Sequence, residues 1–278
     1  MEQMNILVTL DKNYIPPLRV LLYSMVRSDP QTHFVVYVAH SSLTDEDFAE
    51  IRRGISEAQC TICSVPVEAD VLGDAPVLRR LSKETYYRLL AASYLPKEVD
   101  RVLYIDPDVC VIRPLTAFYN MDLQGKLMAG AGHVNRFLRW VNFKRLHIRR
   151  NEDYINAGIL LMDISKLRAL DNTQDLLDYV AHNSRKLLLG DQDVINAYYD
   201  GELLRLDARI YNLDEKFYAR CQKHGDIDLD WVAQNTVLIH YNGSRKPWRA
   251  DYDGQLGDYY YTFRDELEAL SGVPYEKN

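Results

Sequence analysis

Short apolar runs and helical patterns alternate along the first part of the chain. Apolar runs predict strands at residues 5–10, 34–38, 60–67 and 99–105. Patterns of helical period lie between them and predict helices at residues 15–27, 44–58 and 86–95. Two prolines open the first helix, and Thr44 and Ser82 cap the others. Strands that alternate with helices are typical of a mostly parallel sheet with helices on both faces.

The second half of the chain is more mixed. Further strands are predicted at residues 127–131, 159–162 and 237–240. Further helices are predicted at residues 165–180, 191–199 and 259–271. No internal repeat and no linker rich in Pro or Gly divides the sequence, so we expect one α/β domain spanning residues 1–278.

The overall charge argues against a nucleic-acid partner. The formal net charge is −7 and the pI is about 5.5, so the field of the protein repels phosphate backbones. No apolar run approaches the roughly 18 residues that a bilayer requires. Residues Met1–Met4 lack the basic start of a signal peptide. The sequence therefore predicts a soluble, cytoplasmic protein.

The cysteines include one C-x-x-C, formed by Cys60 and Cys63 within a predicted strand; Cys110 and Cys221 complete the set. No second C-x-x-C and no pair of histidines accompanies it, as a zinc site requires. We expect core thiols in a reducing compartment.

Polar residues follow two predicted strands that end at the same edge of the sheet. Asp11 follows the first strand, and Asp106 follows the strand at 99–105. Side chains at i and i+2 of an extended chain face the same way, with Cα atoms about 6.6 Å apart, so Asp106 and Asp108 converge. Pro107 ends the strand between them. The pair suits one divalent cation, although a D-P-D turn with a capping aspartate is the simpler alternative.

His240 ends its own strand and can add an imidazole to the two acids. Oxygen ligands alone suit Mg²⁺ or Mn²⁺, and the added nitrogen shifts the preference toward Mn²⁺. After it come Gly243, Lys246 and Trp248, which provide open backbone, an ammonium group and an aromatic plane. We expect this segment to hold a diphosphate next to the metal.

Together these pieces resemble glycosyltransferase family 8, the retaining sugar transferases that include bacterial lipooligosaccharide galactosyl- and glucosyltransferases and, more remotely, glycogenin. The matching pieces, in the family's order, are Thr9–Tyr14, Thr85–Arg88, Val102–Val109, Asn156–Leu161, Asp191–Asp193 and the H-x-x-G-x-x-K-P-W run His240–Trp248. The resemblance implies a GT-A type fold, a Rossmann-like mixed sheet flanked by helices with the donor at its carboxyl edge.

The resemblance also implies roles for single residues toward a UDP-hexose donor. Asp11 and Asn13, in the piece that begins with Thr9, match positions that hydrogen-bond uracil and ribose, and Tyr14 matches the ring that stacks on the base. Arg88 matches an arginine that reaches the donor's phosphate or sugar; the alternatives are a polar loop at residues 11–14 and a solvated charge at Arg88.

Further matches lie around the transferred sugar and its diphosphate. Asn156 and Ala157 match a turn that touches the sugar, and Gly243 and Lys246 belong to the diphosphate segment. Asp191 and Gln192 match a pair below the reacting carbon. Asp191 is also a candidate N-cap of the following helix, and the two roles can coexist.

The expected chemistry leaves the role of Gln192 open. Retention normally calls for a carboxylate nucleophile, whereas the family places an amide here. Either the amide attacks weakly, or the acceptor enters on the leaving-group face while Gln192 and Asp191 stabilise positive charge on the sugar. We favour attack on the leaving-group face.

The identities of the donor hexose and of the acceptor are not determined by two further features of the sequence, His133 and the segment 134–150. His133 stands where galactosyltransferases of the family tend to carry an acid, so the hexose is either glucose or galactose. The segment 134–150 carries six Arg or Lys residues among apolar ones. It predicts either a solvated helix with a docked apolar side, or a surface for an anionic acceptor or an anionic membrane.

The sequence therefore predicts a Mn²⁺-dependent (or Mg²⁺-dependent) retaining glycosyltransferase that moves a hexose to a saccharide or lipid-linked saccharide. Within the domain we expect donor binding in residues 1–133, the acceptor side at 134–150 and the remaining catalytic part in 151–278. The alternatives are a metal-dependent nucleotide-sugar hydrolase and a nucleotide-sugar-binding protein without turnover.

Overall fold

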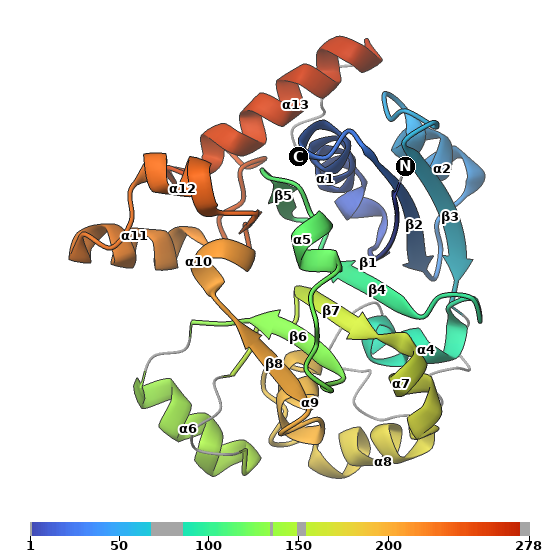
Figure 1. Ribbon diagram of the computed structural model, residues 1–278, viewed down its shortest axis with the longest axis vertical. Helices are drawn as coiled ribbons and strands as arrows, with labels where there is room; N and C mark the ends of the chain where they lie inside the picture. Colours follow the sequence, from blue (N-terminus) through green and yellow to red (C-terminus); the bar gives the residue numbers. More distant parts are fainter. Residues whose placement is uncertain (1, 68–85, 134–135, 149–153, 273–278) are drawn as a thin grey trace.

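A seven-stranded mixed sheet forms the centre of the computed structural model, which describes residues 2–67, 86–133, 136–148 and 154–272 (Figure 1). In sheet order the strands are β3 (Cys60–Pro66), β2 (Thr32–His40), β1 (Glu2–Thr9), β4 (Arg101–Ile105), β7 (Ile159–Asp163), β6 (Met128–Ala131) and β8 (Leu203–Leu206). The first four are parallel to one another, β7 is antiparallel to β4 and β6, and β8 is parallel to β6. The sheet is therefore mixed, with β7 reversed inside it.

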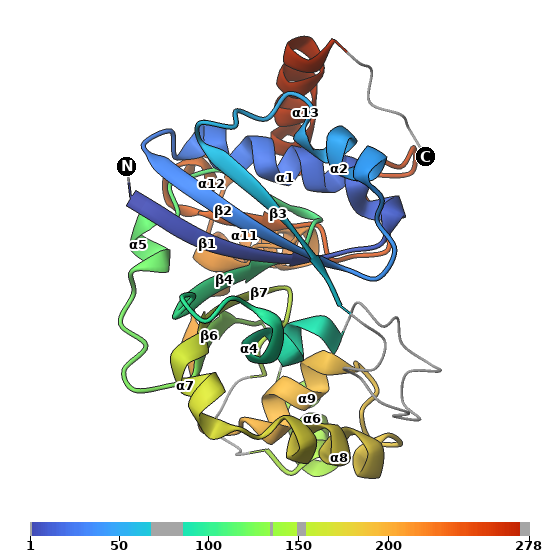
Figure 2. The same ribbon diagram turned by 90° about the vertical axis from the view of Figure 1, so that its right-hand side faces the viewer.

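Helices cover both faces of this sheet. The α-helices of the described residues are α1 (Ile15–Ser28), α2 (Asp45–Arg52), α4 (Ala91–Tyr94), α5 (Thr116–Tyr119), α6 (Arg136–Leu146), α7 (Ile164–Leu170), α8 (Thr173–Asn183), α9 (Asp191–Tyr198), α10 (Ala208–Tyr211), α11 (Glu215–His224), α12 (Leu229–Asn235) and α13 (Gly257–Ser271). Short 3₁₀ helices occupy Lys12–Tyr14 and Arg88–Leu90. Figure 2 shows α1 and α2 on one face and α4, α7, α8 and α9 on the other.

Alternating residues of the central strands enter two hydrophobic cores. On β1, Ile6 and Val8 pack into the core that includes Leu18 of α1, whereas Leu7 packs into the core on the opposite face. All of these side chains are fully buried. This period of two buries both faces of β1, as expected for a parallel strand between helical layers.

A separate two-stranded sheet joins a segment near the middle of the chain to one near its end. It pairs β5 (Val109–Val111) with β9 (Leu238–His240) in antiparallel register, with Val109 opposite His240. Cys110 and Ile239 of this pair join a third core with α11, α12 and α13. Because β5 begins directly after Asp108, this pairing brings His240 to the carboxyl edge of the central sheet.

The predicted strands are confirmed, but three predicted helices differ from the structure. The helix predicted at 44–58 ends at Arg52, and Gly54 follows with φ of +81°, outside the helical region. The helix predicted at 165–180 is wrong as one element, because Asp171 adopts a left-handed φ of +46° and separates α7 from α8. Residues 86–95 hold a 3₁₀ turn and the short α4; the predicted cap Ser82 lies outside the described residues.

Several short elements were not predicted at all. They are β5, β8, α5, α10, α11 and α12. Most span only three or four residues, too short for an apolar period to stand out, and β8 is an edge strand with a partly exposed sequence. The second half is therefore more helical than the sequence indicated, whereas the mixed, mostly parallel sheet is confirmed.

The C-x-x-C cysteines face opposite sides of the sheet. Cys60 is buried in the core under α1 and α2, whereas Cys63 packs against the core on the other face. Burial raises the pKa of the Cys60 thiol to about 12, so it stays protonated near neutral pH. Two side chains on opposite faces of one strand do not converge on one ion.

The basic segment 134–150 contains α6, and a buried ion pair connects this helix to α9. Arg145 binds Asp193 of α9, with Nη2 2.9 Å from Oδ1, and the side chain of Asp193 is fully buried. Leu138 and Trp140 on the same helix remain 46% and 49% exposed. Residues 134, 135, 149 and 150 of the segment lie outside the described residues. No helix among the described residues combines the length and apolarity needed to cross a bilayer.

Candidate active site

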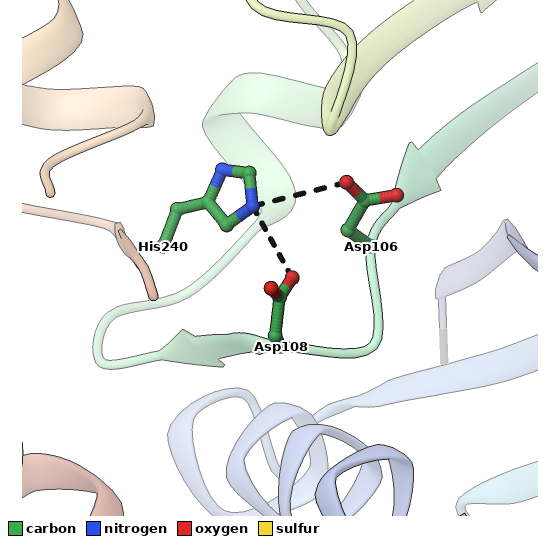
Figure 3. A group of neighbouring side chains, drawn as sticks. All are labelled: Asp106, Asp108 and His240. Atoms are coloured by element: carbon green, nitrogen blue, oxygen red, sulfur yellow. Dashed lines mark ion pairs between the residues drawn. The ribbon is translucent and has the colours of Figure 1, made fainter. Parts of the chain in front are cut away.

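Asp106, Asp108 and His240 meet at the carboxyl edge of the sheet (Figure 3). The N–H of Asp106 donates to the carbonyl of Gly158 at 2.7 Å, which fixes the end of β4 against β7. His240 Nε2 lies 3.2 Å from Asp108 Oδ1 and 3.8 Å from Asp106 Oδ2. One ligand atom from each residue lies within 4.8 Å of the others, so the three side chains could hold one metal ion.

A chain of hydrogen bonds determines which nitrogen of His240 faces the acids. The backbone N–H of Gly158 donates to Asn156 Oδ1 at 2.9 Å, and that oxygen also accepts from Asn212 Nδ2 at 3.1 Å. Asn212 therefore turns its own Oδ1 toward His240 Nδ1, 2.9 Å away, and Nδ1 must donate. This leaves Nε2, which faces two carboxylates, to carry a proton or to bind a metal ion.

The space around these ligands also fits a metal ion. Asp108 Oδ1 is buried and, within the described part of the chain, accepts no hydrogen bond of good geometry. A cation between it and His240 Nε2 would satisfy both atoms. Gly158 keeps the space open, since a Cβ there would lie 2.3 Å from His240 Cε1 and 2.5 Å from Asp106 Oδ2.

Lys246 binds Asp108 from the side away from His240. Its ammonium group donates to Asp108 Oδ2 and, at 2.6 Å, to the carbonyl of Tyr241. Burial alone would raise the pKa of Asp108, but the charges and hydrogen bonds of His240 and Lys246 hold it well below its usual range. Asp108 is therefore ionised at neutral pH although it is buried.

Arg88 is buried and shared between two acids. Its guanidinium lies 3.0 Å from Asp106 Oδ1 and 2.8 Å from Asp191 Oδ2, and it donates to the carbonyl of Ala157 at 2.8 Å. Its carbon CZ also lies 4.3 Å from the centre of the Tyr104 ring. Burial would lower the pKa of Arg88, but the two carboxylates raise it. The alternative of a solvated surface charge at Arg88 is wrong.

Asp191 and Gln192 open α9 beside this arginine. The N-cap position belongs to Gly190, so the prediction that Asp191 caps the helix is wrong. Gln192 Oε1 accepts from Asn156 Nδ2 at 2.9 Å and from the N–H of Ala157 at 3.3 Å. The amide oxygen of Gln192 thus ends the hydrogen-bond chain that begins at His240.

The residues predicted to hold the nucleotide lie along the end of β1. Asp11 Oδ1 accepts from the N–H of Asn13 at 2.8 Å, so Asp11 caps the short 3₁₀ helix Lys12–Tyr14. Burial, followed by the charges of Asp108 and Asp106, raises the pKa of Tyr14, so its hydroxyl stays protonated beside those acids. The Tyr14 ring meets Trp248 edge to face, 6.3 Å between centroids.

Thr9, which was also predicted to contact the nucleotide, makes its hydrogen bond inside the protein. It is buried, and its hydroxyl lies 3.0 Å from the Tyr104 hydroxyl, which in turn donates to Asp106. Thr9 therefore supports the metal-binding acids through Tyr104, in addition to any contact with a ligand.

Gly243 and His133 lie on either side of Asp214. Gly243 lines a cleft of about 70 Å³ together with Asp214 and His240. A Cβ on Gly243 would approach only one carbonyl, at 3.9 Å, so packing does not require glycine at this position. His133 Nε2 lies 2.8 Å from Asp214 Oδ2, and its ring stacks on Phe217 at 4.3 Å.

The family model described as "Glycosyl transferase family 8" matches residues 5–252, a range that includes every side chain of this cluster. The chain belongs to glycosyltransferase family 8. It is therefore a glycosyltransferase, and its mixed sheet with flanking helices is the GT-A fold of that family.

Relatives and solved structures agree with the family. Glycosyltransferase GlyF of Streptococcus pneumoniae is 24% identical over 94% of this chain, which spans 61% of GlyF. Lipopolysaccharide 1,2-glucosyltransferase of Escherichia coli is 25% identical over 89% of this chain and 73% of that protein. The crystal structure of the galactosyltransferase LgtC with donor and acceptor sugar analogs has a TM-score of 0.82, with 24% identity and 98% of each chain covered.

Neither Asn212 nor the role of Gly158 in this family 8 site was predicted from the sequence. Asn212 lies in a stretch with no strong period, just after the four-residue helix α10, so nothing marked it as functional. Gly158 stands inside the N-A-G-I-L-L piece, and a glycine directly before a buried strand was the available signal.

Asn212 should control metal affinity because it orients His240. We expect Asn212→Ala to raise the dissociation constant for Mn²⁺ by about 10- to 100-fold, the usual effect of losing a partner that orients a ligand. Titration of Mn²⁺ followed by electron paramagnetic resonance in the presence of UDP measures this. Asn235→Ala, which changes an exposed asparagine on α12, is the control. Equal Mn²⁺ affinity in the Asn212→Ala and unsubstituted proteins would contradict the orienting role.

Asp191 should make stability depend on pH. Burial raises its pKa to about 6 against the opposing charge of Arg88, whereas an unfolded aspartate titrates at about 3.9. The folded state holds the proton more tightly, so stability is lost as pH rises from about 4 to about 6. We expect the free energy of unfolding of the unsubstituted protein, measured relative to that of Asp191→Asn, to fall by about 3 kcal/mol over this range. Urea unfolding of both proteins across pH tests it, and a constant difference between them argues against it.

Proposed function

We propose that the chain transfers a hexose, glucose or galactose, from a UDP-sugar to a saccharide or lipid-linked saccharide acceptor, with retention of anomeric configuration and with Mn²⁺. The observation that carries this proposal is the convergence of Asp106, Asp108 and His240, with Nε2 of the histidine turned toward the acids. A carboxylate pair with one imidazole suits Mn²⁺ better than it suits Mg²⁺ or Ca²⁺.

The charges of the site support departure of a diphosphate. A divalent cation held by Asp106, Asp108 and His240 would offset the negative charge that develops on the leaving phosphate. Lys246 adds a second positive group on the far side of Asp108. Asp11, Asn13 and Tyr14 are proposed to hold the uridine, with Thr9 behind them; Tyr14 lies close enough to the acids for their charges to raise its pKa.

The sugar is proposed to lie against Arg88, Asn156 and Ala157, above Gln192, and Gly243 is proposed to lie with Lys246 at the diphosphate. The amide oxygen of Gln192 already accepts two hydrogen bonds, from Asn156 and from the backbone of Ala157. Lone pairs engaged in this way are poorly placed to attack the anomeric carbon. This favours a mechanism in which the acceptor attacks on the leaving-group face, the departing phosphate takes the acceptor proton, and Gln192 and Asp191 stabilise positive charge on the ring.

Metal-dependent release of UDP is the direct test. We expect UDP-glucose or UDP-galactose to yield UDP with Mn²⁺, and Asp108→Ala to abolish the release because it removes a ligand and the partner of Lys246.

The identity of the products distinguishes the proposed transfer from the two alternative functions. A sugar phosphate would indicate a nucleotide-sugar hydrolase, and tight binding of UDP-sugar with no product in the presence of acceptor mixtures would indicate a binding protein without turnover.

Gln192→Ala tests the role of the amide. We expect turnover to fall by about 10²- to 10³-fold, as for loss of one group that stabilises a transition state, with little change in the Michaelis constant for the donor. Initial rates of UDP release across donor concentrations measure both quantities. Near-normal turnover would show that the amide matters to neither route.

Peripheral membrane contact is proposed through residues 134–150, which would locate the protein at the cytoplasmic face of a membrane. The exposed Leu138 and Trp140 stand among basic residues of α6, a combination that binds anionic lipid surfaces. We expect the protein to float with liposomes of anionic lipid and Trp140→Ser to weaken this. Equal flotation with neutral and anionic liposomes would remove the proposal.

A further inference from the structure

A basic cavity adjoins the site on the side away from the nucleotide residues. Its volume is about 510 Å³, within the range of about 300–1,000 Å³ usual for ligand pockets. Its lining residues come from the ends of β6 and β8 and from the helices α10 and α11. Figure 1 shows these four elements next to one another. The residues that line it are Gly132, His133, Arg205, Leu206, Asp207, Ala208, Arg209, Phe217 and Arg220.

Basic side chains predominate among the described residues that line this cavity, in a protein that is acidic overall. Three guanidinium groups line it against the single carboxylate of Asp207. Asp207 is already engaged by Arg209, whose Nε lies 3.0 Å and 3.1 Å from its two oxygens. Arg205 and Arg220 line the cavity as well, so guanidinium groups outnumber carboxylates among the described residues that line it.

Arg139 of α6 adds to this positive charge. Burial, followed by the charge of Arg139, lowers the pKa of Arg205, so the two like charges are held near each other. Planar guanidinium groups bind phosphate and carboxylate oxygens through paired hydrogen bonds.

One ion pair separates this cavity from the metal-binding residues. His133 lines the cavity and binds Asp214, which lines the cleft that contains His240 and Gly243. Asp214 Oδ2 also accepts from Asn242, two residues after His240, at 3.3 Å. A molecule bound in the cavity therefore lies across the His133–Asp214 pair from the cleft that His240 and Gly243 line.

We propose that the cavity binds an anionic group, a phosphate or carboxylate, of the acceptor saccharide. The proposal rests on the proposed transfer function and adds to it a class of acceptor. Arg205 and Arg220 bind the anionic group, and the stacked rings of His133 and Phe217 provide a flat wall for a neighbouring sugar ring. The hydroxyl that receives the hexose then lies on the cleft side of His133.

Binding of small probes tests this without requiring turnover. With the donor site filled by UDP and Mn²⁺, calorimetry compares glucose, glucose 6-phosphate and glucuronic acid. We expect at least one of the two anionic probes to bind about tenfold more tightly than glucose, as charged hydrogen bonds to guanidinium groups predict. The two anionic probes separate phosphate from carboxylate as the preferred group.

Substitutions then locate the binding site. We expect the double substitution Arg205→Gln and Arg220→Gln to reduce the preference for the anionic probe over glucose to less than about threefold. Lys223→Gln should retain the full preference. Lys223 is an exposed basic residue on α11, as Arg220 is, but it does not line the cavity. Far-UV circular dichroism confirms that the variants are folded.

The outcomes separate the two proposals. No preference for either anionic probe in the unsubstituted protein, or a preference that survives the double substitution, overturns the anion site. Binding of UDP with Mn²⁺, measured first in each protein, reports on the donor site alone. Its absence in the unsubstituted protein contradicts the proposed transfer function, whatever the probes do.

Discussion

The arrangement of the active site depends on Arg88, because three acids are crowded at one edge of the sheet. Asp106, Asp108 and Asp191 come from two distant parts of the chain, and burial makes the negative charges of Asp108 and Asp191 costly. Arg88 neutralises two of them at once and also binds the carbonyl of Ala157. Removing its charge would leave Asp106 and Asp191 repelling each other in a buried place.

The second constraint is the orientation of the polar side chains in the site, which a backbone N–H group determines. The N–H of Gly158 can only donate, and from that single fact the direction of Asn156, Asn212 and His240 follows. The same asparagine, Asn156, donates to Gln192. The metal-binding histidine and the amide below the sugar are therefore held by one continuous set of hydrogen bonds that starts from the loop before β7.

Much of this fold was predictable because long apolar runs mark buried strands. The acids at 106 and 108 and the imidazole at 240 were predictable because each follows such a run, and ends of strands share an edge. Contacts between segments were not predictable from periodicity. Lys246 binds Asp108 across 138 positions, and Asn212 binds His240 across 28, and neither pairing leaves a trace in local sequence. Short elements such as β5 and β8 were missed because tertiary pairing, and not their own pattern, makes them strands.

The pairing of β5 with β9 has a consequence for how the protein is made. Both strands are only three residues long, and they join the middle of the chain to its last third. While the protein emerges from a ribosome, Asp108 appears long before the histidine and lysine that offset its charge. The nascent amino-terminal half can form strands β1 to β4, but its future ligand cluster stays incomplete until residue 246 has been synthesised. Assembly of the catalytic centre is therefore a late event, and a truncated product that stops before β9 carries an uncompensated acid at the edge of its sheet.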